Sequence, residues 1–315
     1  MQKIPVLAIV GPTASGKTRT AVEVCKRIGG EVVSADSMQV YKGMNIATAK
    51  PDLEEMQGIP HHMIDIISPE ESFSAAAYVE MAGKCIRDIH KRKKVPVICG
   101  GTGLYVDSLL SDNVFPDHEP EQKIRKSIME EFSKEGGQSL YDELKRVDPE
   151  SAEKIHENEI NRQVRALEYF RLTGKKISAR NRNAAKKTSP YNCLWIGINY
   201  RNRELLYEKI NSRVDLMLEK GLIKEAEHFL SNAEKTAGQA IGYKELAPYF
   251  SGSPALDECI ENLKQSTRQY AKRQLTWFRK NRDINWFYQD DYSEETEMMR
   301  DIFLLIDAEF PGGSI

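Results

Sequence analysis

Residues 6–18 read VLAIVGPTASGKT, an apolar run followed by a glycine-rich turn. The turn, Gly11 to Thr18, fits the pattern G-x-x-x-x-G-K-[ST] of loops that cradle polyphosphates. Its glycines let backbone N–H groups converge on anionic oxygens, Lys17 adds a positive charge, and Thr18 can ligate Mg²⁺. Residues 17–28 then place apolar side chains at helical spacing. Strand, loop and helix in this order predict a phosphate site, with a plain glycine-rich turn as the alternative.

Other short apolar runs alternate with helical segments along the chain. They lie at 31–35, 95–99, 193–198 and, more weakly, 284–288. This alternation predicts an α/β fold of the P-loop NTPase type, a parallel sheet flanked by helices. Ligands of such sheets gather beyond the carboxyl ends of the strands. We therefore expect four turns to share one rim: Gly11 to Thr18, the turn at Asp36, GGTG at 100–103 and NYR at 199–201.

Residues 112–189 show no strand signal and contain three helical patterns, within 121–136, 138–148 and 159–174. We expect an inserted all-helical domain here, between core segments 1–111 and 190–315. A chain of 315 residues can supply both, because single cores rarely grow beyond roughly 250 residues. The segment from Leu256 to Asn281 is predicted to be one long helix.

The composition is that of an ordinary soluble protein, 40% apolar and 29% charged, without a run of about 18 apolar residues. The first residues do not resemble a signal peptide. The five cysteines are scattered and include no C-x-x-C pair, which favours neither a disulfide framework nor a zinc site. We expect a cytoplasmic protein without membrane segments, and a monomer.

The net charge of −2 conceals two basic stretches. Residues 162–213 hold thirteen Lys and Arg against three Glu, and residues 264–282 hold seven Lys and Arg without an acid. Local density of positive charge is what phosphate contacts require. Aromatic residues, Tyr270, Trp277 and Phe278, are interleaved with the second stretch. Nucleic-acid binding is the favoured interpretation, and a solvated helix face is the alternative.

Asp36 is the carboxylate that directly follows an apolar run near the phosphate loop. As a Mg²⁺ ligand it would fit a nucleotide hydrolase or a kinase, the common fates of such a loop. A P-loop kinase of a small metabolite therefore stays open as an alternative function. It leaves the basic stretches and the helical insert unexplained.

Five blocks of sequence carry a resemblance to a known family. They are GPTASGKT at 11–18, SADSMQVYKGMNIATAKP at 34–51, GGTGLYVDSLL at 100–110, RQVRALEYFRLTGK at 162–175 and TRQYAKRQLTWFR at 267–279. Together, and in this order, they resemble the bacterial tRNA dimethylallyltransferases. Those enzymes attach the prenyl group of dimethylallyl diphosphate to the exocyclic N6 amine of the adenosine just 3′ of the anticodon. The resemblance implies this activity, a Mg²⁺ cofactor and tRNA as partner.

The resemblance also assigns roles to residues of this chain. The donor diphosphate would be bound by Gly11, Pro12, Thr13, Ala14, Ser15, Gly16, Lys17 and Thr18, with Thr18 as metal ligand. Arg213 would reach the diphosphate, although a surface arginine on an amphipathic helix is its alternative reading. The tRNA would be contacted by Asp36, Ser37, Met38, Gln39, Thr102, Asn161, Arg162, Gln163, Val164, Arg165, Gln239, Ala240, Ile241, Gly242, Tyr243 and Lys244.

The implied chemistry agrees with the residue types. Breaking an allylic carbon–oxygen bond builds negative charge on the leaving diphosphate, which N–H groups, Lys17, a cation on Thr18 and Arg213 would stabilise. The adenine amine is a weak nucleophile, so a carboxylate that accepts its proton is valuable. Asp36 is the candidate base, with a place among the Mg²⁺ ligands as its alternative role.

Three other interpretations remain at this stage. The chain could be a nucleotide-gated RNA-binding protein without chemistry, or a prenyl transferase of free adenine nucleotides. The HHMID motif at 61–65 could suggest a metal site. Adjacent histidines on a strand point to opposite faces, which favours a structural or donor-pocket role instead.

Overall fold

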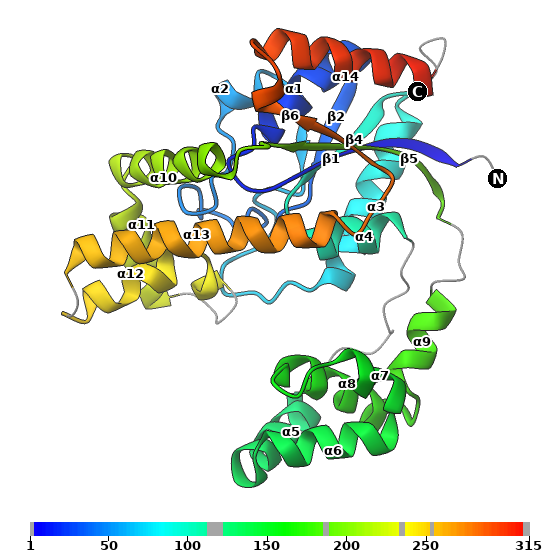
Figure 1. The fold of residues 1–315 in the computed structure, drawn as a ribbon, viewed down its shortest axis with the longest axis vertical. Coiled ribbons are helices and arrows are strands. Elements are labelled where there is room, and N and C mark those ends of the chain that lie inside the picture. Colours follow the sequence, from blue (N-terminus) through cyan, green and yellow to red (C-terminus); the bar gives the residue numbers. More distant parts are fainter. Residues whose placement is uncertain (1–2, 112–121, 185–188, 233–236, 253–254, 311–315) are drawn as a thin grey trace. The chain divides into compact units, whose positions relative to one another are not determined.

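The computed structural model describes residues 3–111, 122–184, 189–232, 237–252 and 255–310. The chain divides into two compact units, Met1–Leu110 with Ser189–Ile315, and Ser111–Thr188 (Figure 1). The expected insert boundaries near 112 and 189 border residues 112–121 and 185–188, which lie outside the described residues. Lys186 and Lys187 of the first basic stretch lie there too.

A parallel sheet forms the centre of the larger unit, which confirms the predicted α/β fold class. Within the described residues it has six strands in the order β3-β2-β4-β1-β5-β6. The strands are β1 (Ile4–Val10), β2 (Gly30–Ser34), β3 (His61–His62), β4 (Val95–Gly100), β5 (Tyr191–Asn199) and β6 (Ile284–Tyr288). The apolar run at residues 6–10 lies in the central strand β1, which is between β4 and β5.

Helices surround this sheet and extend beyond it (Figure 1). They are α1 (Lys17–Ile28), α2 (Leu53–Met56), α3 (Ala75–Lys91), α4 (Gly103–Leu110), α10 (Arg203–Glu219), α11 (Leu222–Asn232), α12 (Tyr243–Phe250), α13 (Leu256–Phe278) and α14 (Glu295–Glu309), with the 3₁₀ turns η1 (Ala237–Gln239) and η2 (Gln289–Asp291). The long helix expected from Leu256 to Asn281 is α13, and it ends at Phe278.

Alternating side chains of β1 explain the layers of this unit. Leu7 and Ile9 point to one face, where they join apolar residues of α1 and α14. Val6 and Ala8 point to the other face and join residues of α3 and α4. Because a strand buried on both faces needs apolar side chains at every position, VLAIV is a continuous apolar run and not an alternating one.

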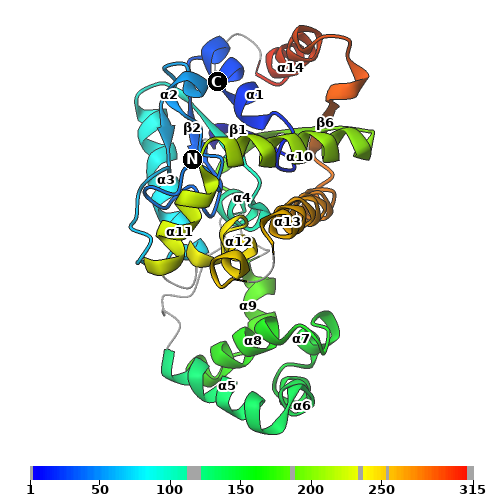
Figure 2. The ribbon, with the colours of Figure 1, turned by 90° about the vertical axis from the view of Figure 1, so that its left-hand side faces the viewer.

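A third apolar cluster joins α10, α11, α12 and α13 to the segment that follows β2 (Figure 2). Val40, Tyr41 and Met44 of that segment are fully buried in it. The segment after Asp36 is therefore held between the sheet and the C-terminal helices, although it has little regular structure of its own.

The smaller unit is helical throughout its described residues. Its helices are α5 (Gln122–Glu135), α6 (Gly137–Val147), α7 (Pro149–Lys154), α8 (Ile160–Thr173) and α9 (Ile177–Ala184). Ile128, Leu144 and Leu167 lie in its own apolar core. Asp148 is buried and accepts hydrogen bonds from Ser151 and Ser178, which joins the start of α7 to α9.

No helix within the described residues is both long and apolar enough to cross a membrane.

Candidate active site

The phosphate loop lies between β1 and α1, as the sequence predicts. Gly11 has a φ of +149°, and a Cβ there would stand 2.2 Å from the carbonyl oxygen of Ile198. Glycine at this position thus lets the loop pass close against β5. The Lys17 ammonium donates a hydrogen bond back to the Pro12 carbonyl. The first turn of α1 begins at Lys17, so its free N–H groups add to an anion site.

Lys17 is electrostatically unusual. Removal of its ammonium group from water lowers the pKa of Lys17 to about 8, and the charge of Arg213 acts in the same direction. Arg213 approaches the loop from α10. Its guanidinium donates to Thr13 Oγ1 and to the Ala49 carbonyl, each at 3.5 Å. Positive charge from two distant parts of the chain therefore meets at the phosphate loop.

Asp36 begins the turn that follows β2. Its Oδ1 accepts hydrogen bonds from the backbone N–H groups of Met38 at 2.8 Å and Gln39 at 3.3 Å. Within the described residues, hydrogen bonds reach this carboxylate through Oδ1 only. Oδ2 accepts no hydrogen bond from the described residues. Ser37 N–H donates to Thr102 Oγ1 at 3.1 Å, which ties this turn to the GGTG turn after β4.

Gln39 fixes the other side of the Asp36 turn. Its amide nitrogen donates to the carbonyls of Thr48 and Ala49, and its amide oxygen accepts from Ser34. Residues 45–47 are in turn held by Glu225 of α11, whose carboxylate accepts from the N–H groups of Asn45, Ile46 and Ala47 at 2.8–2.9 Å.

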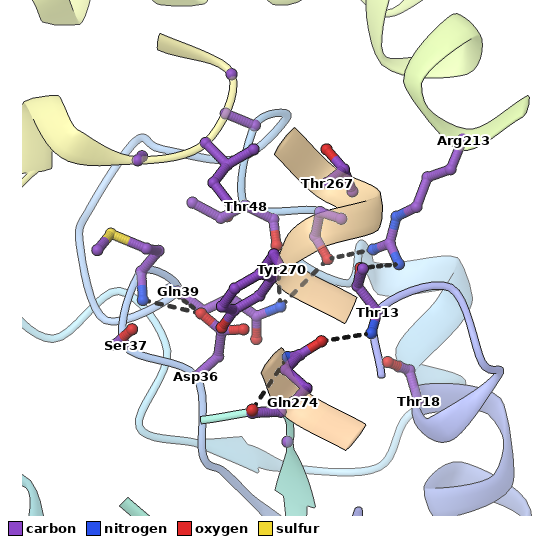
Figure 3. A pocket seen from close by; sticks show the side chains of 18 of the residues that line it. Thr13, Thr18, Asp36, Ser37, Gln39, Thr48, Arg213, Thr267, Tyr270 and Gln274 are labelled. Carbon is purple, nitrogen blue, oxygen red and sulfur yellow. Dashed lines mark hydrogen bonds between the residues drawn. The ribbon is translucent and has the colours of Figure 1, made fainter. Parts of the chain in front are cut away.

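One cavity of about 320 Å³ collects these groups (Figure 3). The predicted residues that line it are Thr13, Lys17, Thr18, Asp36, Ser37, Met38, Gln39, Arg213, Gln239, Ala240, Ile241, Gly242 and Lys244. Donor-binding and acceptor-binding candidates therefore share one cavity. Three of the four expected turns reach it, the third through Gly100 and Gly101. The fourth does not line it, because Asn199 is buried and Arg201 pairs with Asp291.

The remaining phosphate-loop candidates, Gly11, Pro12, Ala14, Ser15 and Gly16, form the loop backbone beside this cavity. The two histidines of HHMID separate, as expected for a strand. His61 lines the cavity, and His62 Nε2 lies 2.7 Å from the Glu31 carboxylate. The described residues contain no group of three or more His, Cys, Asp or Glu side chains that could hold a metal ion.

Four of the residues expected to contact tRNA are buried. Gln163 and Val164 are fully buried in the helical unit, and the Gln163 amide donates to the carbonyls of His156 and Glu157. Tyr243 is fully buried, and its hydroxyl donates to Glu225. Ala240 is 2% exposed. Of the four, Ala240 still lines the cavity, whereas Asn161, Arg162 and Arg165 are exposed on α8.

Sequence reasoning missed several groups that line or brace the cavity. Helix α13 contributes Thr267, Tyr270, Arg273 and Gln274 to its wall. Burial, together with the charge of Asp36, raises the pKa of Tyr270 to about 12. The spacing of these residues in TRQYAKRQ, three and four apart, was the available signal that they share one helix face. Glu225, which holds residues 45–47, and Gln289, whose amide donates to the Ser15 carbonyl, do not line the cavity and left no such signal.

Comparison with known proteins identifies relatives. A family model described as IPP transferase matches residues 39–281. The tRNA dimethylallyltransferase of Caldanaerobacter subterraneus subsp. tengcongensis is 49% identical over 304 residues, which cover 95% of this chain and 96% of that protein. That of Acetivibrio thermocellus is 45% identical over 300 residues, covering 94% of this chain and 96% of the relative.

Solved structures are similar over nearly the whole chain. The full-length tRNA isopentenylpyrophosphate transferase of Bacillus halodurans superposes with a TM-score of 0.74 at 42% identity, covering 99% of this chain and 98% of that one. A eukaryotic dimethylallyltransferase acting on tRNA gives a TM-score of 0.83 at 30% identity, covering 97% of this chain and 79% of the other.

Proposed function

This chain belongs to the IPP transferase family, and we propose that it transfers the dimethylallyl group of dimethylallyl diphosphate to the exocyclic N6 amine of the adenosine just 3′ of the anticodon in tRNA, releasing diphosphate. The observation that carries the proposal is the shared cavity. It brings Lys17 and Arg213, suited to a diphosphate, into one space with Asp36, suited to an amine. Because the substrate is tRNA, we expect the enzyme to work in the cytoplasm. We also propose that it is a monomer.

The phosphate loop and Arg213 act on the leaving group. As the carbon–oxygen bond of the donor breaks, its electron pair leaves with the diphosphate. N–H groups at the start of α1, the Lys17 ammonium and the Arg213 guanidinium would surround that charge, so little reorganisation would be needed as it develops. Thr18 and the diphosphate offer the oxygen ligands that Mg²⁺ prefers, and the ion would add positive charge to the leaving group.

Asp36 acts on the acceptor. The N6 nitrogen forms the new bond to the prenyl carbon, and its proton passes to Oδ2 of Asp36. Oδ1 is occupied by the Met38 and Gln39 N–H groups, which keeps the carboxylate oriented. A carboxylate also selects an amino group over a carbonyl oxygen, since two acceptors facing each other lack a proton to share. An anticodon-loop base can enter such a cavity because it is cheaper to unstack than a paired one.

The RNA itself would be held by the basic stretches. Arg162 and Arg165 of α8, and Lys272 and Arg273 of α13, are exposed. Exposed arginine and lysine supply the phosphate contacts that give most nucleic-acid affinity. The tRNA contacts of Ser37, Thr102, Gln239 and Lys244 belong to the same proposal.

The test is direct. The protein is incubated with tRNA that lacks this modification, dimethylallyl diphosphate and Mg²⁺, and the digested nucleosides are analysed by mass. We expect an isopentenyl adduct on adenosine, formed without ATP. Free AMP in place of tRNA is the control for specificity. Turnover of ATP to ADP without RNA, and no adduct, would favour the kinase instead.

A further inference from the structure

Gln274 of α13 lies between the two halves of the cavity, and the reaction as described does not use it. Gln274 is 5% exposed. The amide oxygen accepts from the Thr13 N–H at 2.8 Å, and the amide nitrogen donates to the Gly101 carbonyl at 3.0 Å (Figure 3). One side chain thereby joins the phosphate loop to the GGTG turn.

Each of these two turns lies beside the groups that would bind one of the two reactants, the prenyl donor or the adenine acceptor. On the donor side, Thr13 Oγ1 receives a hydrogen bond from Arg213. On the acceptor side, Gly101 is followed by Thr102, whose hydroxyl accepts from the Ser37 N–H beside Asp36. The Gln274 amide is therefore a short link between the residues that would bind the diphosphate and the carboxylate that would receive the amine proton.

The link requires an amide at this position and glycine opposite it. A Cβ on Gly101 would stand 2.0 Å from Gln274 Nε2, so the amide fits because residue 101 has no side chain. The two bonds also need one acceptor and one donor at fixed separation, which an uncharged amide supplies. A carboxylate would place one oxygen correctly against Thr13 and the other against a second acceptor, the Gly101 carbonyl.

We propose that Gln274 is a positioning residue that sets the phosphate loop against the Asp36 turn, so that the prenyl carbon and the adenine amine are aligned for transfer. This inference rests on the proposed function. Misplacing reacting groups by about 1 Å can slow a reaction roughly 10²-fold while binding is retained. Loss of the link should therefore appear in the rate at saturating substrates more than in either affinity.

Gln274→Met keeps the length and packing of the side chain and removes both hydrogen bonds. We expect kcat to fall roughly 10²-fold, with the dissociation constants for donor and tRNA within a few-fold of the wild type. Asn262→Met, which removes an exposed amide from the same helix outside the basic stretch, is the matched control. A near-normal kcat of Gln274→Met overturns the proposal.

Gln274→Glu separates positioning from simple packing through its pH profile. When protonated, the new carboxyl can accept from Thr13 and donate to Gly101 as the amide does. When ionised, it cannot donate. Burial raises carboxyl pKa values, so activity relative to wild type should rise as pH falls from about 8.5 to 5.5, with Asn262→Glu showing no such trend.

An activity ratio to wild type that stays constant across this pH range would also overturn the proposal, even if Gln274→Met fails to fold. The wild-type transfer assay is run first in the same buffers. A wild type that forms no adduct refutes the proposed function itself, whereas an active wild type with unaffected Gln274 variants refutes the positioning role alone.

Discussion

Asp36 and Lys17 face the same cavity with opposite charges, but the protein holds them differently. One oxygen of Asp36 accepts hydrogen bonds from backbone N–H groups, and the other accepts none from the described residues. Lys17 is bound by the Pro12 carbonyl and has a lowered pKa because its charge is removed from water. The first arrangement favours a base of fixed orientation. The second favours an ammonium whose charge is stabilised most when an anionic ligand binds.

Replacing Asp36 with Asn tests the base. An Asn can keep an acceptor oxygen toward the Met38 and Gln39 N–H groups, so the turn should keep its shape while the proton acceptor is removed. We expect single-turnover transfer at saturating substrates to slow about 10²–10⁴-fold, the usual contribution of general-base catalysis. Donor and tRNA affinities should change only a few-fold.

A different result would assign Asp36 to the metal. If the Asn variant binds donor weakly and regains a normal saturated rate as Mg²⁺ is raised, Asp36 is a Mg²⁺ ligand and not the base. Single-turnover rates over a range of Mg²⁺ concentrations, with wild type in parallel, separate the two roles.

The lowered pKa of Lys17 predicts a pH-dependent donor affinity. The folded protein without donor has this pKa at about 8, and a bound diphosphate favours the protonated form. Donor binding should therefore take up a proton above pH 8, and affinity should fall up to tenfold for each further pH unit. Calorimetric titrations at pH 7 and 9, in buffers of different ionisation enthalpy, measure both effects.

Lys17→Arg is the matched control for this effect, because an arginine stays charged across the range. If the wild type shows no proton uptake above pH 8, or if the Arg variant loses affinity with pH just as steeply, Lys17 is not the titrating group.

At the scale of helices and strands, the sequence predicts the elements whose side chains repeat regularly. Continuous apolar runs predicted β1, β2, β4 and β5, because buried parallel strands need apolar residues on both faces. β3 was not predicted as part of the sheet. It has two residues, His61 and His62, and pairs through its backbone with Val32 and Val33, which no side-chain pattern reveals.

From the sequence, the cavity could be predicted only at its glycine-rich turns and its charged residues. The phosphate loop and Asp36 stand directly after strands, so their shared rim follows from topology. Gln274 is one glutamine within a basic helix, and its role depends on Thr13, 261 positions away in the sequence. Gln163 and Tyr243 were expected to contact RNA because the family resemblance implies it, but burial of each side chain is a tertiary property.

The exposed basic residues of α8 and α13 predict a salt-dependent interface. Neutralising Arg162, Arg165, Lys272 and Arg273 to Gln, in pairs by helix, should weaken tRNA binding. The slope of log affinity against log salt should become shallower by about one unit for each RNA phosphate that the variant no longer neutralises. Filter binding from low to moderate salt measures it. Donor affinity should stay unchanged for the α8 pair, whereas Arg273 of the α13 pair also lines the cavity.

The control is Lys84→Gln with Lys91→Gln on α3, which removes the same charge from an exposed helix outside both basic stretches. If the α8 or α13 pair leaves the slope as steep as this control does, that helix is a solvated surface and not part of the RNA interface.

At the scale of the whole molecule, a charged cluster lies at the amino-terminal ends of β2 and β4, the opposite end of these strands from the cavity. Glu31 is 2% exposed and pairs through both oxygens with Arg92, beside His62 and Lys94. It connects β2, β3 and the residues just after α3. The Arg92 hydrogen bonds hold the pKa of Glu31 at about 2, below its ordinary value of 4.5.

Glu31→Gln should therefore lower the free energy of unfolding at pH 7 by about 3 kcal/mol, from 1.36 kcal/mol per pKa unit. Because the folded pKa is depressed, this stabilisation is complete above pH 4.5 and disappears as pH falls toward 2. The difference in unfolding free energy between variant and wild type, measured by urea unfolding, should thus narrow between pH 5 and pH 3.

The control is Glu80→Gln, which breaks an exposed pair with Lys84 and should change stability little at any pH. A Glu31→Gln deficit that is the same at pH 7 and pH 3 would mean that side-chain packing, not the ionised carboxylate, supplies the stability at this end of the sheet.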